Sequence, residues 1–244
     1  AREMRHMGTL FLLLTGGEPL LHPDFRMIME ELKHMGMIVS INTNGTMIDE
    51  DMADFLAAQM PRRVNITIYG TDDSTYEKMC HFRPGYGRAV RAVRLLKERG
   101  VDVKLNGSLA KDNDKEAVKL IRLAEILGVP VHIDTYMYPA ARERNEGFCS
   151  ESRLEPEKAA RSRVEILKAS MGTEKFLEYR KEKLDSLNRD ISDNPDLSVR
   201  CRAGKSSFAI SWQGNMTPCV MLPCPSVPVF RRGFGEAWKI LAED

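Results

Sequence analysis

The part of this sequence best suited to bind a ligand is a short turn that follows an apolar run. The run is Leu10–Leu14, and after Thr15 it continues as Gly16, Gly17, Glu18 and Pro19. Glycines let the backbone approach a ligand closely, a carboxylate accepts hydrogen bonds from an ammonium group, and proline stiffens the exit from the turn. The turn therefore indicates a site for a cationic group, although an ordinary strand-to-helix turn with a solvated glutamate is also open.

Apolar strands alternate with amphipathic helices along the chain as far as Ile133, and this order must position the turn. The predicted strands are Leu10–Thr15, Ile38–Ile41, Val64–Ile68, Val101–Leu105 and Val129–Ile133. The predicted helices between them have apolar residues at helical spacing over Phe25–Met35, Met52–Leu56, Val90–Leu96 and Val118–Leu127. Such alternation predicts an α/β fold with a parallel sheet.

Each predicted strand ends in polar or glycine-containing residues. These ends are Gly16–Glu18, Asn42–Gly45, Thr67–Gly70, Asn106–Ser108 and Asp134–Tyr136. Because the carboxyl ends of parallel strands meet at one edge of the sheet, we expect them to form a common binding rim. Turn chemistry at each strand end, without a ligand, is the competing interpretation.

With these residues in view, the chain resembles radical S-adenosylmethionine enzymes of the SPASM or twitch subgroup. Gly16, Gly17 and Glu18, with Pro19, are similar to the GGEP motif that holds the cofactor's methionine amino group, and Thr43 and Asn44 match the family's TNG strand end. The resemblance implies an α/β fold in which parallel strands form a partial (β/α) TIM-like barrel. It also implies a small C-terminal β-hairpin segment of the SPASM or twitch kind.

The resemblance extends to other cofactor contacts. Thr67 matches the residue that contacts ribose, while Tyr69 stands where an acid is more usual. Arg83 resembles the arginine that pairs with the methionine carboxylate, which a guanidinium fork suits, and a surface arginine is its alternative. Asn106 and Ser108 are expected neighbours of the adenine or ribose.

The resemblance implies two cofactors, S-adenosyl-L-methionine and a 4Fe-4S cluster that cleaves it reductively. The resulting 5'-deoxyadenosyl radical would abstract hydrogen from a peptide or protein substrate, as in peptide and sulfatase maturases, with a reductant such as flavodoxin or ferredoxin. The family's CxxxCxxC cluster loop and first strand are absent from residues 1–244, so we expect a chain truncated at both ends that is inactive alone. The alternative is a non-catalytic protein that binds a nucleoside or peptide on the same scaffold.

Cysteines near the C-terminus provide a separate signal. Cys201, Gly214 and Cys219 have the spacing that opens a SPASM pattern, and Cys224 adds a third nearby thiol whose position the pattern does not predict. The resemblance implies that these cysteines ligate an auxiliary 4Fe-4S cluster. We therefore predict a truncated barrel over 1–150, a helical connector over 151–198 and the first half of a cluster domain over 199–244.

Composition limits the choice of partners. Lys and Arg number 36 against 35 Asp and Glu, which gives no charge bias toward nucleic acid or a membrane surface. No apolar run approaches the roughly 20 residues of a membrane span, and we expect a cytoplasmic protein. Arg142 and Arg144 follow the last predicted strand, in a loop that either binds peptide carboxylates or serves solubility. For Cys80 and Cys149 we expect structural thiols.

Overall fold

The computed structural model describes residues 1–136, 152–193 and 201–243. The parallel sheet comprises β1 (Phe11–Leu14), β2 (Ile38–Thr43), β3 (Arg63–Ile68), β4 (Val103–Ser108) and β5 (Val131–Asp134), in that order. The helices around it are α1 (Arg2–His6), α2 (Phe25–His34), α3 (Glu50–Gln59), α4 (Asp73–Cys80), α5 (Gly85–Glu98) and α6 (Ala117–Leu127), with two short 3-10 helices, η1 (Pro19–Leu21) and η2 (Lys111–Asn113). The α/β prediction with a partial barrel is confirmed.

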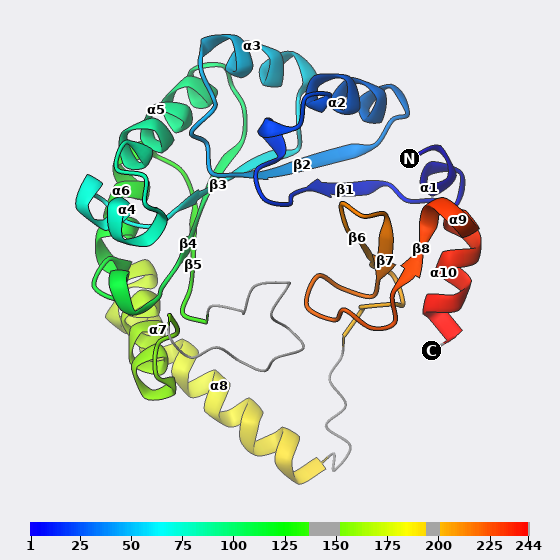
Figure 1. Cartoon of the computed structure of the whole chain (residues 1–244). Helices are drawn as coiled ribbons and strands as arrows, with labels where there is room; N and C mark the ends of the chain where they lie inside the picture. The colour runs from blue at the N-terminus through cyan, green and yellow to red at the C-terminus, as the bar shows by residue number, and fades with distance from the viewer. Residues whose placement is uncertain (137–151, 194–200, 244) are drawn as a thin grey trace.

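The sheet curves, and α2, α3, α5 and α6 lie along its outer side (Figure 1). Side chains alternate accordingly: in β2, Val39 and Ile41 are fully buried, whereas Ser40 and Asn42 are only partly buried. The same alternation in β3 and β4 gives an apolar outer face that packs against the helices and a polar inner face. The inner face is thus the side on which the strands present hydrogen-bonding groups.

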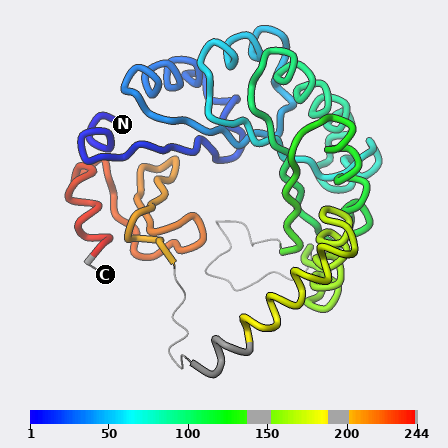
Figure 2. The backbone as a smooth tube through the Cα atoms, turned by 180° about the vertical axis from the view of Figure 1, so that it is seen from behind, coloured from blue at the N-terminus to red at the C-terminus, as the bar shows by residue number. Residues whose placement is uncertain are grey.

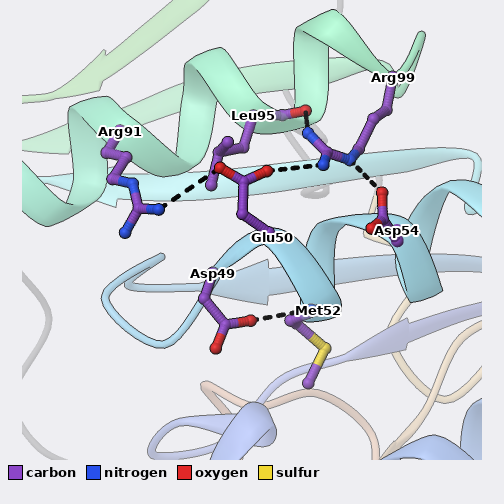
Figure 3. A network of polar contacts seen from close by, with 7 residues as sticks. All are labelled: Asp49, Glu50, Met52, Asp54, Arg91, Leu95 and Arg99. Carbon is purple, nitrogen blue, oxygen red and sulfur yellow. Dashed lines mark hydrogen bonds and ion pairs between the residues drawn. The ribbon is translucent and has the colours of Figure 1, made fainter.

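Charged side chains join two of the outer helices. Arg99, just after α5, donates to Glu50 at 2.7 Å and to Asp54 at 2.5 Å, both on α3, and Arg91 lies 3.5 Å from Glu50 (Figure 3). Asp49 accepts from the Met52 backbone N–H at 2.9 Å and so caps α3. These contacts fix α3 against α5, and with them the strands β2 and β3 that lead into and out of α3.

Helix α4 was not predicted. The sequence of this segment is typical of a polar loop. The helix has only eight residues, and Tyr76 is the single buried residue among them, so no apolar periodicity marks it. Its start is fixed by Asp72, which accepts from the Thr75 backbone N–H at 2.8 Å. One buried tyrosine and a cap therefore replace the periodic apolar face on which sequence reasoning depends.

Beyond β5, the structure has four further helices among the described residues and the predicted C-terminal hairpin. The helices are α7 (Pro156–Met171), α8 (Thr173–Asp193), α9 (Val229–Arg232) and α10 (Phe234–Glu243), and the strands are β6 (Ala209–Ile210), β7 (Asn215–Thr217) and β8 (Val227–Pro228). The hairpin is part of a three-stranded antiparallel sheet, because β8 pairs with β7. No described helix is long and apolar enough to cross a bilayer.

The two ends of the chain meet. Figure 2, seen from behind, shows the N-terminal segment beside the C-terminal helix, in agreement with Figure 1. Helix α1 packs against α10, and Met4 contacts both the main core and the small core around Met216 and Phe234. The small C-terminal sheet is therefore fixed beside β1.

Candidate functional site

Glu18 links the carboxyl ends of β1 and β2. Its Oε1 accepts from the Thr43 hydroxyl at 2.7 Å and from the Leu20 backbone N–H at 3.1 Å, and its Oε2 accepts from the Asn44 backbone N–H at 2.7 Å. A carboxylate has about four acceptor positions, so three protein donors leave about one for a ligand. The carboxylate thus serves first to hold two strand ends together.

Gly16 and Gly17 lie next to this carboxylate and face open space. Apart from the glycine and its two chain neighbours, no heavy atom lies within 4 Å of the position that a Cβ would occupy at either residue. Gly16 has φ of 149°, which residues with side chains rarely adopt. The turn therefore combines bare backbone, free volume and a half-buried carboxylate, as a bound amino group requires.

The end of β2 is held by its own side chains. Thr43 is 3% exposed, and its hydroxyl oxygen also accepts from the Gly45 backbone N–H at 3.0 Å. Asn44 Oδ1 accepts from the Thr46 backbone N–H at 2.8 Å and from the Thr46 hydroxyl at 2.7 Å. The predicted Thr43 and Asn44 are thus beside Glu18, and the Asn44 side-chain oxygen is already used within the turn.

Thr67, Asn106 and Ser108 lie on the inner face of β3 and β4. Thr67 and Asn106 are direct partners in the strand register, so their side chains are neighbours. The Asn106 Oδ1 is buried and has no hydrogen-bond partner among the described residues. An unsatisfied buried acceptor is costly in a protein, and a ligand donor at this place would satisfy it.

Sequence reasoning missed Asn113 and Glu116, which hold the rim together from the next loop. Asn113 is 2% exposed and donates from Nδ2 to the carbonyl oxygens of Tyr69 at 2.7 Å and Ser108 at 2.9 Å. Glu116 is 4% exposed and accepts from the Thr71 backbone N–H at 2.8 Å and its hydroxyl at 2.6 Å. Both follow β4 in a polar stretch that gives no sign of burial.

Two further residues near the rim differ in their surroundings. Burial raises the pKa of Tyr69, and the nearby Cys80 and Glu18 raise it further, so its phenol stays protonated at neutral pH. Arg83 is exposed between α4 and α5, and no hydrogen bond or ion pair joins it to the described residues. The structure therefore does not bring Arg83 into contact with the Glu18 group.

The C-terminal thiols are arranged separately. Cys201 and Cys224 are exposed and Cys219 is half-buried. Cys201 Sγ accepts from the Ala203 backbone N–H and Cys219 Sγ from the Met221 backbone N–H, each at 3.4 Å, a contact that suits a thiolate ligand. Nowhere in the described ranges do three His, Cys, Asp or Glu side chains gather as a metal site would require. The auxiliary cluster stays a prediction.

Arg142, Arg144 and Cys149 lie outside the described residues.

Comparison with protein families matches residues 1–124 to the Radical SAM superfamily. Among curated proteins, the AdoMet-dependent heme synthase of Methanosarcina barkeri is 24% identical over 97% of this chain and 70% of its own length. The probable GTP 3',8-cyclase of Aeropyrum pernix is 28% identical over 93% of this chain and 64% of its own length. The chain thus spans about two thirds of each relative.

Among the solved structures that share the fold are SuiB and anSMEcpe. Streptococcus suis SuiB superposes with a TM-score of 0.68 at 14% identity, covering 97% of this chain and 57% of SuiB, and it has also been solved with S-adenosylmethionine and with its precursor peptide SuiA. The protein anSMEcpe with bound AdoMet gives a TM-score of 0.63 at 17% identity, covering 97% of this chain and 65% of that one.

Proposed function

Because the chain belongs to the radical SAM superfamily, we propose that the rim at the carboxyl ends of β1 to β4 binds S-adenosylmethionine beside a 4Fe-4S cluster. When bound to a reduced cluster, this cofactor supplies a 5'-deoxyadenosyl radical that abstracts a hydrogen atom from a substrate. The observation that supports the proposal best is the Glu18 contact between two strand ends, with open space at Gly16 and Gly17 beside it.

Each rim residue has a role that follows from its chemistry. The free backbone at Gly16 and Gly17 and the remaining acceptor position of Glu18 bind the methionine amino group. The unpartnered Asn106 Oδ1 accepts from a ribose hydroxyl or the adenine amino group, with Thr67 and Ser108 beside it. Arg83, which is exposed and has no partner in the described part of the chain, binds the methionine carboxylate.

The substrate that we propose is a peptide or a protein, and the reaction is a radical modification of it. SuiB, which has the same fold, has been solved with a bound precursor peptide, and so has anSMEcpe with a peptide. These likenesses concern the fold alone. We also propose that Cys201 and Cys219 ligate an auxiliary cluster, and Cys224 is a third candidate ligand.

Cofactor binding is testable on the 244-residue chain by calorimetry with S-adenosylmethionine and S-adenosylhomocysteine. Gly17→Val fills the open space without requiring a left-handed backbone, and we expect it to weaken binding about tenfold or more. Ala58→Val is the control, because Ala58 is exposed near the C-terminal end of α3, which leads into the amino end of β3 and so lies at the opposite edge of the sheet. Equal affinities for the two variants would contradict the placement of the cofactor.

Catalysis is tested on the chain extended by the residues that precede Ala1 in its reading frame. After anaerobic reconstitution with iron and sulfide, we expect dithionite and S-adenosylmethionine to yield 5'-deoxyadenosine, measured by liquid chromatography. The 244-residue chain contains no CxxxCxxC and should yield none. Cofactor binding without 5'-deoxyadenosine from the extended chain would favour the non-catalytic alternative.

A further inference from the structure

The inner face of β4 carries a lysine below the proposed cofactor rim. In β4, Val103, Leu105 and Gly107 are buried on the helix side, and a Cβ on Gly107 would lie 3.1 Å from Leu120 of α6. Lys104 and Asn106 alternate with them and therefore lie on the opposite, inner face of the curved sheet (Figure 1). Lys104 precedes Asn106 by one step along that face.

Several other polar side chains of the inner face have protein partners. Asn65 donates to Asn42 at 2.8 Å, and His132 lies 3.0 Å from Asp134. Arg63 is paired with Asp102, its Nη2 2.7 Å from the carboxylate.

Lys104 is different from its neighbours. Its side chain is half-buried, and its ammonium group makes no hydrogen bond or ion pair with the described residues. It lies opposite Asn65 in the register of β3 and β4. An ammonium group has three donors, and none of them has an acceptor among the described residues.

A second observation lies one step nearer the rim. The Asn106 Oδ1 is buried and unpartnered, on the same face of the same strand as Lys104. Alternate residues of a strand are about 6.6 Å apart, so an anion at Lys104 would lie next to the cofactor that Asn106 is proposed to bind. Two unsatisfied polar groups, one cationic and one an acceptor, therefore open onto the same side of the sheet.

We propose that Lys104 binds an anionic group of the substrate, a carboxylate or a phosphate, on the inner face of the sheet below the cofactor. This inference rests on the proposed function, because it places the substrate on the face that carries the cofactor rim. It makes Lys104 a specificity-determining residue: a peptide substrate would present an acidic group close to the residue that reacts.

Lysine footprinting of the 244-residue chain tests the proposal without cofactor or cluster. The chain is acetylated with an N-hydroxysuccinimide ester in the presence of glutarate, pyrophosphate or sodium chloride at equal ionic strength, and each lysine is followed by mass spectrometry. An anion at about four times its Kd should slow acetylation of Lys104 about fivefold. Lys181, an exposed lysine of α8, is the internal control and should react at one rate throughout.

The two anions distinguish the sources of the negative charge. Protection by glutarate identifies a carboxylate, and protection by pyrophosphate alone identifies a phosphate. For the anion that protects, Lys104→Gln should weaken binding about tenfold, whereas Lys104→Arg and the control Lys181→Gln should retain it.

Equal rates for Lys104 in all three salts would overturn the proposal. That result would leave the cofactor proposal intact, since formation of 5'-deoxyadenosine is measured separately. Conversely, protection of Lys104 in a chain that does not bind S-adenosylmethionine would retain the anion site and reject the cofactor site.

Discussion

At the scale of single residues, the main finding is how far the Glu18 carboxylate is already satisfied within the protein. Its residue type and its place after a strand predicted a carboxylate that is free to accept hydrogen bonds from a ligand's ammonium group. In the structure, Thr43, Asn44 and Leu20 all donate to it, and two of these donors lie about 25 residues further along the chain. Local sequence could place Glu18 at the rim but could not reveal these partners.

We expect Thr43→Val to destabilise the protein by about 1 to 2 kcal/mol. The substitution removes a buried hydroxyl that donates to Glu18 and accepts from the Gly45 backbone N–H. It leaves the Gly45 N–H without this acceptor, and Glu18 loses one of its three donors. Urea denaturation followed by circular dichroism measures the change. Thr43→Ser keeps the hydroxyl and should remain within about 1 kcal/mol of the parent. An equal loss of stability in the two variants would contradict the part assigned to the hydroxyl, because only Thr43→Val removes it.

The cysteines should differ in reactivity at neutral pH. Burial raises the pKa of the Cys80 thiol, so little thiolate is present there, whereas Cys201 and Cys224 are exposed. We expect iodoacetamide to modify the two exposed thiols about tenfold faster than Cys80, as measured by peptide mass spectrometry. In urea the rates should converge. Equally fast labelling of Cys80 in the folded protein would show that its packing against the main core does not protect the thiol.

At the scale of elements, the sequence predicted the strands and helices in which apolar residues recur with a clear period. The five strands and the helices α2, α3, α5 and α6 have clear periodicity, and their ends were misplaced by only a few residues. The short helix α4 was missed because its stability comes from one cap and one buried tyrosine. Asn113 and Glu116 were missed for a related reason: they are buried by contacts with Tyr69, Ser108 and Thr71, which lie outside their own loop.

The cap of α4 should give a pH-dependent contribution to stability. The hydrogen bond from the Thr75 backbone N–H holds the pKa of Asp72 below its ordinary value of 3.8. A carboxylate with a lowered folded-state pKa stabilises the fold above its unfolded pKa, and this stability is lost as the pH falls through the folded value. Asp72→Ala should therefore cost about 1 kcal/mol at neutral pH, and progressively less below about pH 4.

Urea midpoints between pH 2 and 7 measure this effect for the parent and for two variants. Asp72→Asn is the control, because asparagine also caps helices but does not titrate in this range. It should lie close to the parent at neutral pH. A difference between Asp72→Ala and the parent that stayed constant down to the lowest pH would show that the carboxylate charge has no part in the cap.

At the scale of the whole molecule, the two ends of the chain fasten each other. Glu3 Oε2 accepts from the Phe234 backbone N–H at 2.6 Å, across 231 positions of sequence, and so caps α10 from α1. Met7 lies against Gly235, with its sulfur 3.3 Å from the position of a Cβ there. No local pattern indicates this contact, since α1 has five residues and none is buried.

We expect Glu3→Ala to loosen the C-terminal unit without unfolding the barrel. Loss of the cap should cost about 1 kcal/mol, which corresponds to about fivefold faster amide exchange in the first turn of α10, while exchange in β2 and β3 should not change. Hydrogen–deuterium exchange with mass spectrometry measures both regions. Glu236→Ala is the matched control, because it removes a carboxylate from α10 that makes only an exposed ion pair with Arg232, and such pairs contribute little. Equal exchange in the two variants would mean that the C-terminal unit is held beside α1 by the packing of Met4 and Met7, and that the Glu3 cap adds nothing measurable to it.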